Sequence, residues 1–216
     1  MKHQYFWLFA ILLIAACTPS SSDNTPTTNN GIDTAKGETY ITEREKEMIK
    51  ELNLVRSNPE GYIEYVEKYI YELKTDRWSD ASMIGDEIKT AKELIRELKK
   101  TQSMSTLKPH KGLYKASKKH GDEGKKKGSL DHEGSNGSWP WDRGEKYASD
   151  LTDTNENLVG GPDNVRRSVM ILLVDSGIEG RGHRKNILNP DWKYTACYEV
   201  GQVGDMPNYW VQMFGK

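Results

Sequence analysis

The segments Tyr194-Thr195-Ala196-Cys197-Tyr198-Glu199-Val200 and Tyr209-Trp210-Val211-Gln212-Met213-Phe214 decide the fold class of this chain. Both are short runs rich in Tyr, Val and Trp, which are residues that favour strands. Residues 201–208 lie between them and include glycine, proline and asparagine. The pattern predicts an antiparallel hairpin with a longer loop near the end of the chain.

The part of the chain ahead of this hairpin has helical periodicity instead. Thr42 with Glu45 fits a capping box, and Met48, Leu52 and Val55 follow at helical spacing. Four further helices are expected over residues 59–73, 88–98, 112–127 and 165–173, the last of them capped by Pro162-Asp163-Asn164. Helices in the first part of the domain sequence and strands in its last part predict an α+β domain built in layers.

Three separated segments carry polar residues that a purely structural chain would not need. They are Ser129-Leu130-Asp131-His132-Glu133-Gly134-Ser135-Asn136-Gly137, Asn155-Glu156-Asn157-Leu158 and Arg181-Gly182-His183-Arg184-Lys185-Asn186-Ile187-Leu188-Asn189-Pro190. We interpret all three as loops, because loops on a rigid scaffold are where binding and catalytic residues gather.

The order of these segments resembles the bacterial branch of the CAP family, which comprises cysteine-rich secretory proteins, antigen 5 and pathogenesis-related 1. Leu107-Lys108-Pro109 with Gly112-Leu113, and the closing Tyr209-Trp210-Val211-Gln212, are similar to that family as well. The likeness covers roughly residues 41–215. It implies an α-β-α sandwich with a shallow cleft lined by two histidines and two acidic residues.

By matching motifs, the resemblance assigns His132, Glu156 and His183 to three of the four cleft positions. An ungapped match puts the family's second acid at Ser176, whereas Asp175 is the nearest carboxylate. We assign the fourth position to Asp175. Asn155 stands where the family usually has a glycine, which could alter the segment around Glu156.

Two neutral imidazoles with one or two carboxylates suit Zn²⁺ and leave a coordination position for water. His132 and His183 are therefore the candidate metal ligands, and some family members are similar in holding a divalent metal there. The same four side chains could equally hydrogen-bond to one another across the cleft without a metal. His120, on the inward stripe of its helix, is interpreted as a core histidine.

The N-terminal residues have the features of an export signal. Lys2 precedes an apolar run that stops at Cys17, and the run is shorter than the ~20 residues of a membrane span. Ile14-Ala15-Ala16-Cys17 resembles a bacterial lipobox, which implies that Cys17 is lipidated. Cleavage by an ordinary signal mechanism nearby, with Cys17 incidental, is the alternative.

The expected organisation is therefore a signal over residues 1–16, a lipid-anchored tether over 17–37 and one domain over 38–216. The tether is expected because its Ser, Thr, Asn and Pro residues cannot bury an apolar core. The signal predicts an extracytoplasmic location. Thr18 is not the aspartate that retains some lipoproteins at the inner membrane, so the outer membrane is preferred where the cell has one. With Cys17 lipidated, Cys197 has no partner for an internal disulfide.

Composition narrows the class of partner. The formal net charge is −1, from 31 basic and 32 acidic residues, so no overall field favours nucleic acid. A lysine cluster in the helix expected over 112–127 lacks interleaved aromatics and is interpreted as a solvated face.

Three functions remain open at this point. The first is a non-enzymatic extracytoplasmic domain that binds a lipid-like or other small ligand, which the resemblance supports. The second is a zinc-dependent hydrolase with Glu156 as general base, although the chain has neither a His-Glu-x-x-His nor a Gly-x-Ser-x-Gly motif. The third is a module that binds an envelope or host protein.

Overall fold

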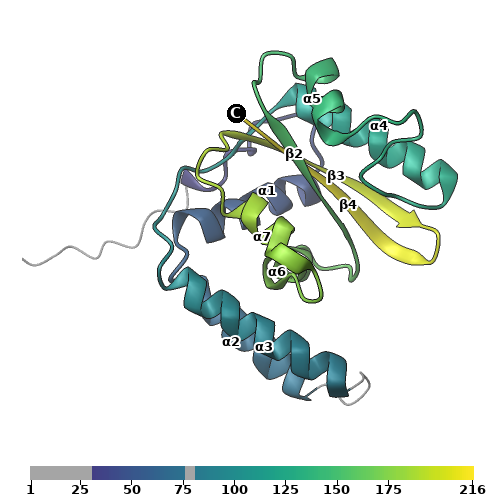
Figure 1. The fold of residues 1–216 in the computed structure, drawn as a ribbon. Coiled ribbons are helices and arrows are strands. Elements are labelled where there is room, and N and C mark those ends of the chain that lie inside the picture. Colours follow the sequence, from purple (N-terminus) through teal and green to yellow (C-terminus); the bar gives the residue numbers. More distant parts are fainter. Residues whose placement is uncertain (1–30, 76–80) are drawn as a thin grey trace, which may run out of the picture.

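The computed structural model describes residues 31–75 and 81–216 (Figure 1). The expected signal, Cys17 and the first part of the expected tether lie outside these residues. Within the described residues, no helix is long and apolar enough to cross a membrane.

The centre of the domain is a four-stranded sheet in the order β1-β3-β4-β2. The long strands β3 (Tyr194–Val203) and β4 (Met206–Gly215) form the antiparallel hairpin, and β2 (Thr154–Gly160) pairs antiparallel with β4. The short β1 (Lys108–Pro109) pairs parallel with β3.

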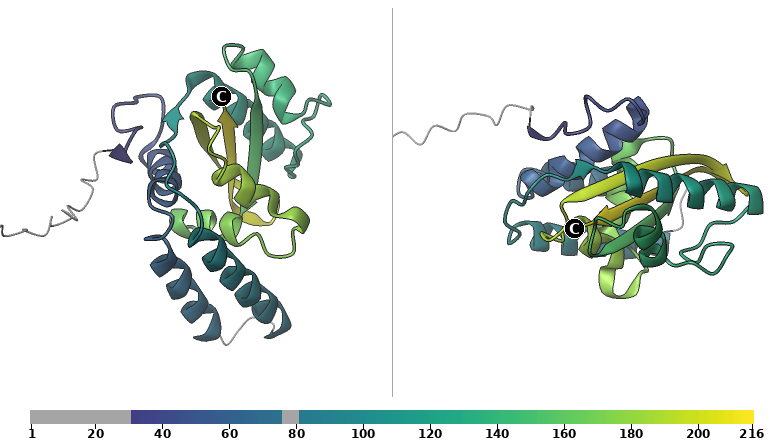
Figure 2. Two further views of the ribbon diagram at one scale, coloured as in Figure 1. Left: turned by 60° about the vertical axis from the view of Figure 1, so that its left-hand side comes forward. Right: turned by 90° about the horizontal axis from the view of Figure 1, so that it is seen from above.

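Helices cover both faces of this sheet (Figures 1 and 2). On one face lie α1 (Glu43–Ser57), α6 (Val165–Val174) and α7 (Gly182–Ile187), with the short 3-10 turn η2 (Glu179–Arg181) before α7. On the other lie α4 (Lys111–Lys127) and α5 (Pro140–Tyr147). The α+β class and the α-β-α layering are therefore confirmed.

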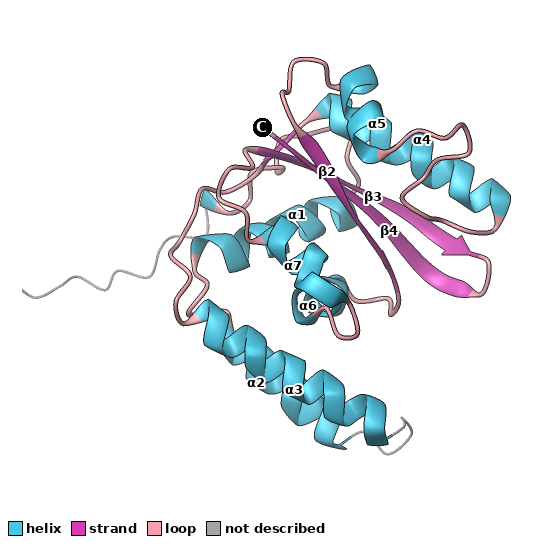
Figure 3. Cartoon of the chain, viewed as in Figure 1, coloured by secondary structure: helices cyan, strands magenta, loops and turns pink. Residues whose placement is uncertain are grey.

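Two further helices extend beyond the layers. α2 (Ile63–Thr75) and α3 (Ala81–Leu98) pack on each other, and α3 also contacts α6. Together they form an arm that projects from the helical face of α1 and α6 (Figures 2 and 3).

Strand β4 explains how the two layers of core are divided. Trp210 and Phe214 belong to the core beneath α1 and α6, whereas Val211 and Met213 belong to the core beneath α4. Alternate residues of a strand point to opposite faces, so one apolar strand supplies both cores. Because both faces are covered, residues 209–214 of β4 read as an apolar run that only the buried Gln212 interrupts.

Local signals identified several helix ends correctly. The Thr42–Glu45 capping box is present at the start of α1, and Asn164 caps α6 by accepting from the backbone N–H of Arg167. His110 caps α4 in the same way, through Nδ1 and the N–H of Leu113 at 3.3 Å. That last cap had no recognised sequence signal.

The loop of the hairpin is shorter than expected. Only residues 204–205 separate β3 from β4, in place of the expected 201–208. Gly201 and Gly204 adopt positive φ angles of 76° and 56°, and the register shifts on both sides of Gly201. Bulges of this kind let the ladder continue through residues that look like a loop.

Two of the three segments interpreted as loops are regular structure. Asn155-Glu156-Asn157-Leu158 lies within β2, and residues 182–187 form α7. Two residues of the expected tether contact the domain: Ala35 is buried, and the Thr34 hydroxyl donates to the carbonyl of Leu107 at 2.7 Å. Helix α5 was not expected at all.

Candidate functional site

Four elements from distant parts of the chain bring the expected cleft residues together. His132 follows α4 in a loop, Glu156 lies on β2, Asp175 ends α6 and His183 lies in the first turn of α7. The structure arranges them as two histidine–carboxylate pairs.

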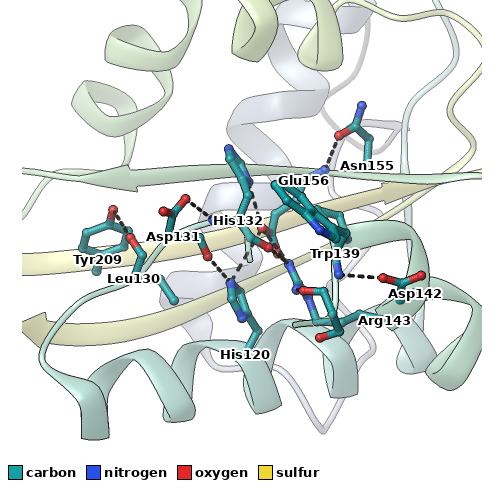
Figure 4. Close-up of polar contacts among 12 residues, drawn as sticks. His120, Leu130, Asp131, His132, Trp139, Asp142, Arg143, Asn155, Glu156 and Tyr209 are labelled. Atoms are coloured by element: carbon teal, nitrogen blue, oxygen red, sulfur yellow. Dashed lines mark hydrogen bonds and ion pairs between the residues drawn. The ribbon is translucent and has the colours of Figure 1, made fainter. Parts of the chain in front are cut away.

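The first pair joins His132 to Glu156. The His132 Nδ1 lies 3.0 Å from Glu156 Oε1 (Figure 4), and the Glu156 side chain is fully buried. The His132 side chain is 38% exposed, so the pair has one buried and one open end. A buried carboxylate on Nδ1 fixes the orientation of the ring and leaves Nε2 for a ligand.

The second pair joins His183 to Asp175. The His183 Nδ1 lies 2.7 Å from Asp175 Oδ1, and the backbone N–H of His183 donates to Asp175 Oδ2 at 3.0 Å. Asp175 has φ 55° and ends α6 in the left-handed region, which Asp adopts more readily than most residues. It is Asp175, and not Ser176, that contacts the second histidine.

The two imidazoles face one another across the cleft. Their ring centroids are 6.5 Å apart and their planes are tilted by 31°. Both Nδ1 atoms are engaged by carboxylates, and among the described residues neither Nε2 has a hydrogen-bond partner. The cleft thus presents two oriented nitrogen acceptors to whatever enters it.

Arg143 is the main contributor that sequence reasoning missed. Its Nη2 donates to both oxygens of Glu156 at 2.9 and 2.8 Å and to the carbonyl of His132 at 3.0 Å. Its Nη1 donates to the carbonyl of Ser138 at 2.7 Å. Arg143 is 4% exposed, so a buried cation balances Glu156 and ties the His132 loop to β2.

His120 is a core histidine, as expected, and it also belongs to the support of the cleft. It is 2% exposed, its Nε2 lies 2.8 Å from the carbonyl of Asp131, and the same atom is 3.8 Å from Glu156 Oε1. Burial lowers the pKa of His120 below its usual value, against a smaller opposing effect of Glu156. A neutral His120 holds the residue immediately before His132.

The residues around His183 brace α7. Arg184 donates to Glu93 and Glu97 on α3, both at 2.8 Å, and to the carbonyl of Leu173 at 2.6 Å. Arg184 therefore forks onto two carboxylates of α3 and ties α7 to the arm. Asn186 bridges to β2 through the side chain of Asn157 at 2.8 Å.

The turn before His183 does not depend on Gly182, which has an ordinary helical conformation with φ −61°. The left-handed residues are Gly180, with φ 76°, and Arg181, with φ 53°. The guanidinium of Arg181 donates to the carbonyls of Asp175 and Ile178, which stabilises that conformation.

A groove of about 1180 Å³ opens beside the second pair. His183 and Asp175 belong to its lining, and the other walls come from α3, β2, α6 and the turn over residues 176–181. Its lining mixes carboxylates with apolar side chains such as Leu158, Ile171 and Leu172. A ligand of this mixed character could therefore lie against α3 while one of its atoms reaches His183.

The donor set limits how a metal ion could be held. Among the described residues, no group of three or more His, Cys, Asp or Glu side chains is placed to bind a metal. Glu156 and Asp175 are already engaged, so the protein offers only the two imidazole Nε2 atoms. With Zn–N bonds of about 2.0–2.1 Å, a tetrahedral ion would hold the two ring centroids about 5 Å apart, so the rings would have to move closer than their 6.5 Å separation to share one ion.

The arrangement nevertheless fits a zinc-type ion in its chemistry. Imidazole nitrogen is a preferred donor for Zn²⁺, and a carboxylate on the other ring nitrogen is the usual outer partner of a metal-binding histidine. The remaining positions would be filled by water or by atoms of a ligand.

A comparison with solved structures found similarity to an outer surface protein of Borrelia burgdorferi and to an extracellular SCP-domain protein of Bacillus anthracis. The first is 24% identical with a TM-score of 0.46, over 60% of this chain and 92% of that chain. The second is 17% identical with a TM-score of 0.41, over 58% of this chain and 38% of that chain.

A comparison with curated proteins found no match. The sequence profile of the cysteine-rich secretory protein family, CAP, matches residues 92–214, which is more than half of the chain. The match covers all four strands and all four cleft residues. This chain therefore belongs to the CAP family.

Proposed function

We propose that this chain is an extracytoplasmic, lipid-anchored binding protein without catalytic activity. Its cleft would hold a divalent metal ion such as Zn²⁺ between His132 and His183, and the adjoining groove would take a lipid-like or other small ligand. The observation that carries the proposal is the pair of facing imidazoles, each oriented by a buried carboxylate.

The protein's own residues would do most of the work of such a site. Glu156 and Asp175 hold the two rings by their Nδ1 atoms, while Arg143 and Arg184 anchor the segments that carry them. A bound ion would supply a positive centre that attracts a polar or anionic group of the ligand. The groove would then receive the rest of the ligand next to His183.

The hydrolase alternative has less support. It requires Glu156 to act as a general base toward a water molecule in the cleft. Both oxygens of Glu156 accept from Arg143, and one of them also contacts His132. A fully buried carboxylate in an ion pair is poorly placed to take a proton from a substrate or a water molecule.

The proposed location rests on the N-terminal sequence. The apolar run before Cys17 and the lipobox-like Ile14-Ala15-Ala16-Cys17 support export and lipidation, and the polar residues that follow support a tether. More than one acyl chain would anchor the protein stably, because each buried methylene contributes about 0.8 kcal/mol. Mass spectrometry of the membrane-bound protein would test acylation, and Cys17→Ser should abolish it.

Metal binding is tested by titrating Zn²⁺ into the folded protein and measuring bound metal by calorimetry. We expect one ion per chain, with binding lost in the His132→Ala/His183→Ala double variant. His110→Asn is the matched control, because His110 is also paired with a carboxylate but lies outside the cleft, with its Nε2 3.0 Å from Asp150 Oδ2. Asn retains a side chain able to cap α4.

The outcomes separate the hypotheses. Binding that survives the double variant, or that disappears in His110→Asn, would show that the cleft is not the metal site. Absence of binding by the folded parent would refute the metal-holding part of the proposal. Extraction and mass analysis of the purified protein would test the ligand, which should be displaced by substitutions in the groove such as Leu158→Glu.

A further inference from the structure

Two tryptophans next to the His132 loop are exposed at the surface. Trp139 and Trp141 are 41% and 57% exposed, and their rings stack with centroids 5.4 Å apart and planes only 4° from parallel. Tryptophan is highly buried on average, and exposed aromatic side chains that lie together mark interaction sites. Stacking buries only one face of each indole, which leaves apolar surface in contact with water.

The backbone that carries the two rings is held firmly. The N–H of Trp139 donates to Asp142 Oδ2 at 2.8 Å, and its carbonyl accepts from the N–H of Arg143 at 3.1 Å. Pro140 begins α5 between the two tryptophans. The side chain of Arg143 also binds the carbonyl of Ser138, so both sides of Trp139 are anchored to the cleft (Figure 4). A preorganised aromatic surface loses little conformational entropy on binding.

Exposed carboxylates lie close to the two tryptophans along the chain. Asp142 and Glu145 are exposed on α5, and Glu145 lies four residues after Trp141, on the same side of the helix. Glu133 is exposed in the neighbouring loop, where the N–H of Gly134 donates to the carbonyl of Ser138. This part of the surface is therefore both aromatic and acidic.

The cations nearest in sequence are engaged elsewhere. Arg143 is buried against Glu156, and Lys146 lies over the ring of Tyr147, 5.4 Å from its centroid. No cation in the described residues lies over either tryptophan ring, although the same protein stacks Arg166 and Arg167 on Tyr65 and Tyr69. Within the described residues, both indole faces of this surface are thus left without a cation, which makes a cation on another molecule a suitable partner.

We propose that the surface formed by Trp139, Trp141, Asp142 and Glu145, the tryptophan surface, binds an arginine-bearing segment of a partner protein. A guanidinium is planar and weakly hydrated, so it can stack on an indole face while its N–H groups bind a carboxylate. Lysine has the same charge but lacks the planar fork. The surface lies outside the space between the two histidines, so its binding does not require a metal.

The test uses the full-length chain in detergent micelles, labelled with 5-fluorotryptophan and observed by fluorine NMR. The signals of Trp139 and Trp141 are assigned from Trp139→Phe and Trp141→Phe. The probe is acetyl-Gly-Arg-Gly-Arg-Gly-amide, and the neutral control peptide has glutamine in place of both arginines. We expect both assigned signals to shift with the arginine peptide and not with the glutamine peptide.

Substitutions then measure the contribution of each chemical feature. Trp141→Ala should weaken binding about fivefold through the lost cation–π contact. Glu145→Gln, which leaves the aromatic rings in place, should weaken it about threefold, and raising the salt concentration should do the same. Tyr71→Ala is the matched control, because Tyr71 is an aromatic side chain 69% exposed on α2, away from this surface.

Several results would overturn the proposal. These are the absence of shifts with the arginine peptide, equal shifts with the glutamine peptide, or unchanged affinity in Glu145→Gln. Shifts produced by N-acetylglucosamine or by phosphatidylcholine vesicles, without a response to the arginine peptide, would show a sugar-binding or membrane-binding surface and would overturn it as well.

Discussion

Replacing Arg143 should test how much of the cleft depends on a single buried cation. Arg143→Met removes the charge and four hydrogen bonds: two to Glu156, one to the carbonyl of His132 and one to the carbonyl of Ser138. Glu156 would then be a fully buried carboxylate without a cation to balance it. Breaking a buried pair from one side costs about 3–5 kcal/mol.

Urea unfolding, monitored by circular dichroism, measures this loss of unfolding free energy. In thermal unfolding of a domain of this size, 1 kcal/mol corresponds to about 2–4 °C, so the melting temperature should fall by roughly 6–20 °C. Adding Glu156→Gln should recover at least about 2 kcal/mol, because the double variant no longer buries an unpaired charge.

Arg44→Met is the control for this experiment. Arg44 also contacts two carboxylates, Glu199 and Asp163, but its side chain is 40% exposed. An exposed pair contributes about 0.2–1 kcal/mol, so this variant should be nearly as stable as the parent. A loss below about 1 kcal/mol in Arg143→Met, or strict additivity with Glu156→Gln, would refute the reasoning.

Three further predictions concern the surroundings of the cleft. Gly144→Ala places a methyl group against β2 where there is no room, so it should lower the free energy of unfolding in urea by about 1–3 kcal/mol. Gly85→Ala is the control, because open space surrounds Gly85 and the folded protein should not be destabilised. Equal effects of the two substitutions would contradict this packing. Asp175→Asn should lower the Zn²⁺ affinity measured by calorimetry about 10–100-fold, whereas Ser176→Ala should leave it unchanged. If Ser176→Ala weakened binding and Asp175→Asn did not, Ser176 would have the role assigned to Asp175. Burial raises the pKa of the Cys197 thiol, so iodoacetamide at mildly alkaline pH should modify Cys197 only when urea unfolds the protein. Mass spectrometry measures the modification. Rapid alkylation of the folded protein would show instead that this strand opens.

The sequence by itself was sufficient where the signal is local. The Thr42–Glu45 capping box, the Asn164 cap and the apolar spacing within the main helices each depend on residues within one or two turns. The closing hairpin was recognisable for the same reason, since it joins neighbouring segments. These elements suffice for the α+β class, and the ordered motifs led to the CAP family.

Other elements of the fold could be recognised only from the tertiary structure. Residues 154–157 of β2 are all polar, so this strand looked like a loop. Glu156 and Asn157 are nevertheless buried, because Arg143 and Asn186 from other elements bind them. Helix α5 is only eight residues long, and its short pattern gave no periodic signal.

The cleft shows the same division between local and long-range information. Its histidines were named from motifs, but Asp175 could be distinguished from Ser176 only by the left-handed turn that aims its carboxylate at His183. Arg143 carries no local sign of its role, because its partners lie on β2 and in the His132 loop. Short-range patterns determine helices and hairpins, whereas a buried ion pair exists only once distant segments pack and exclude water.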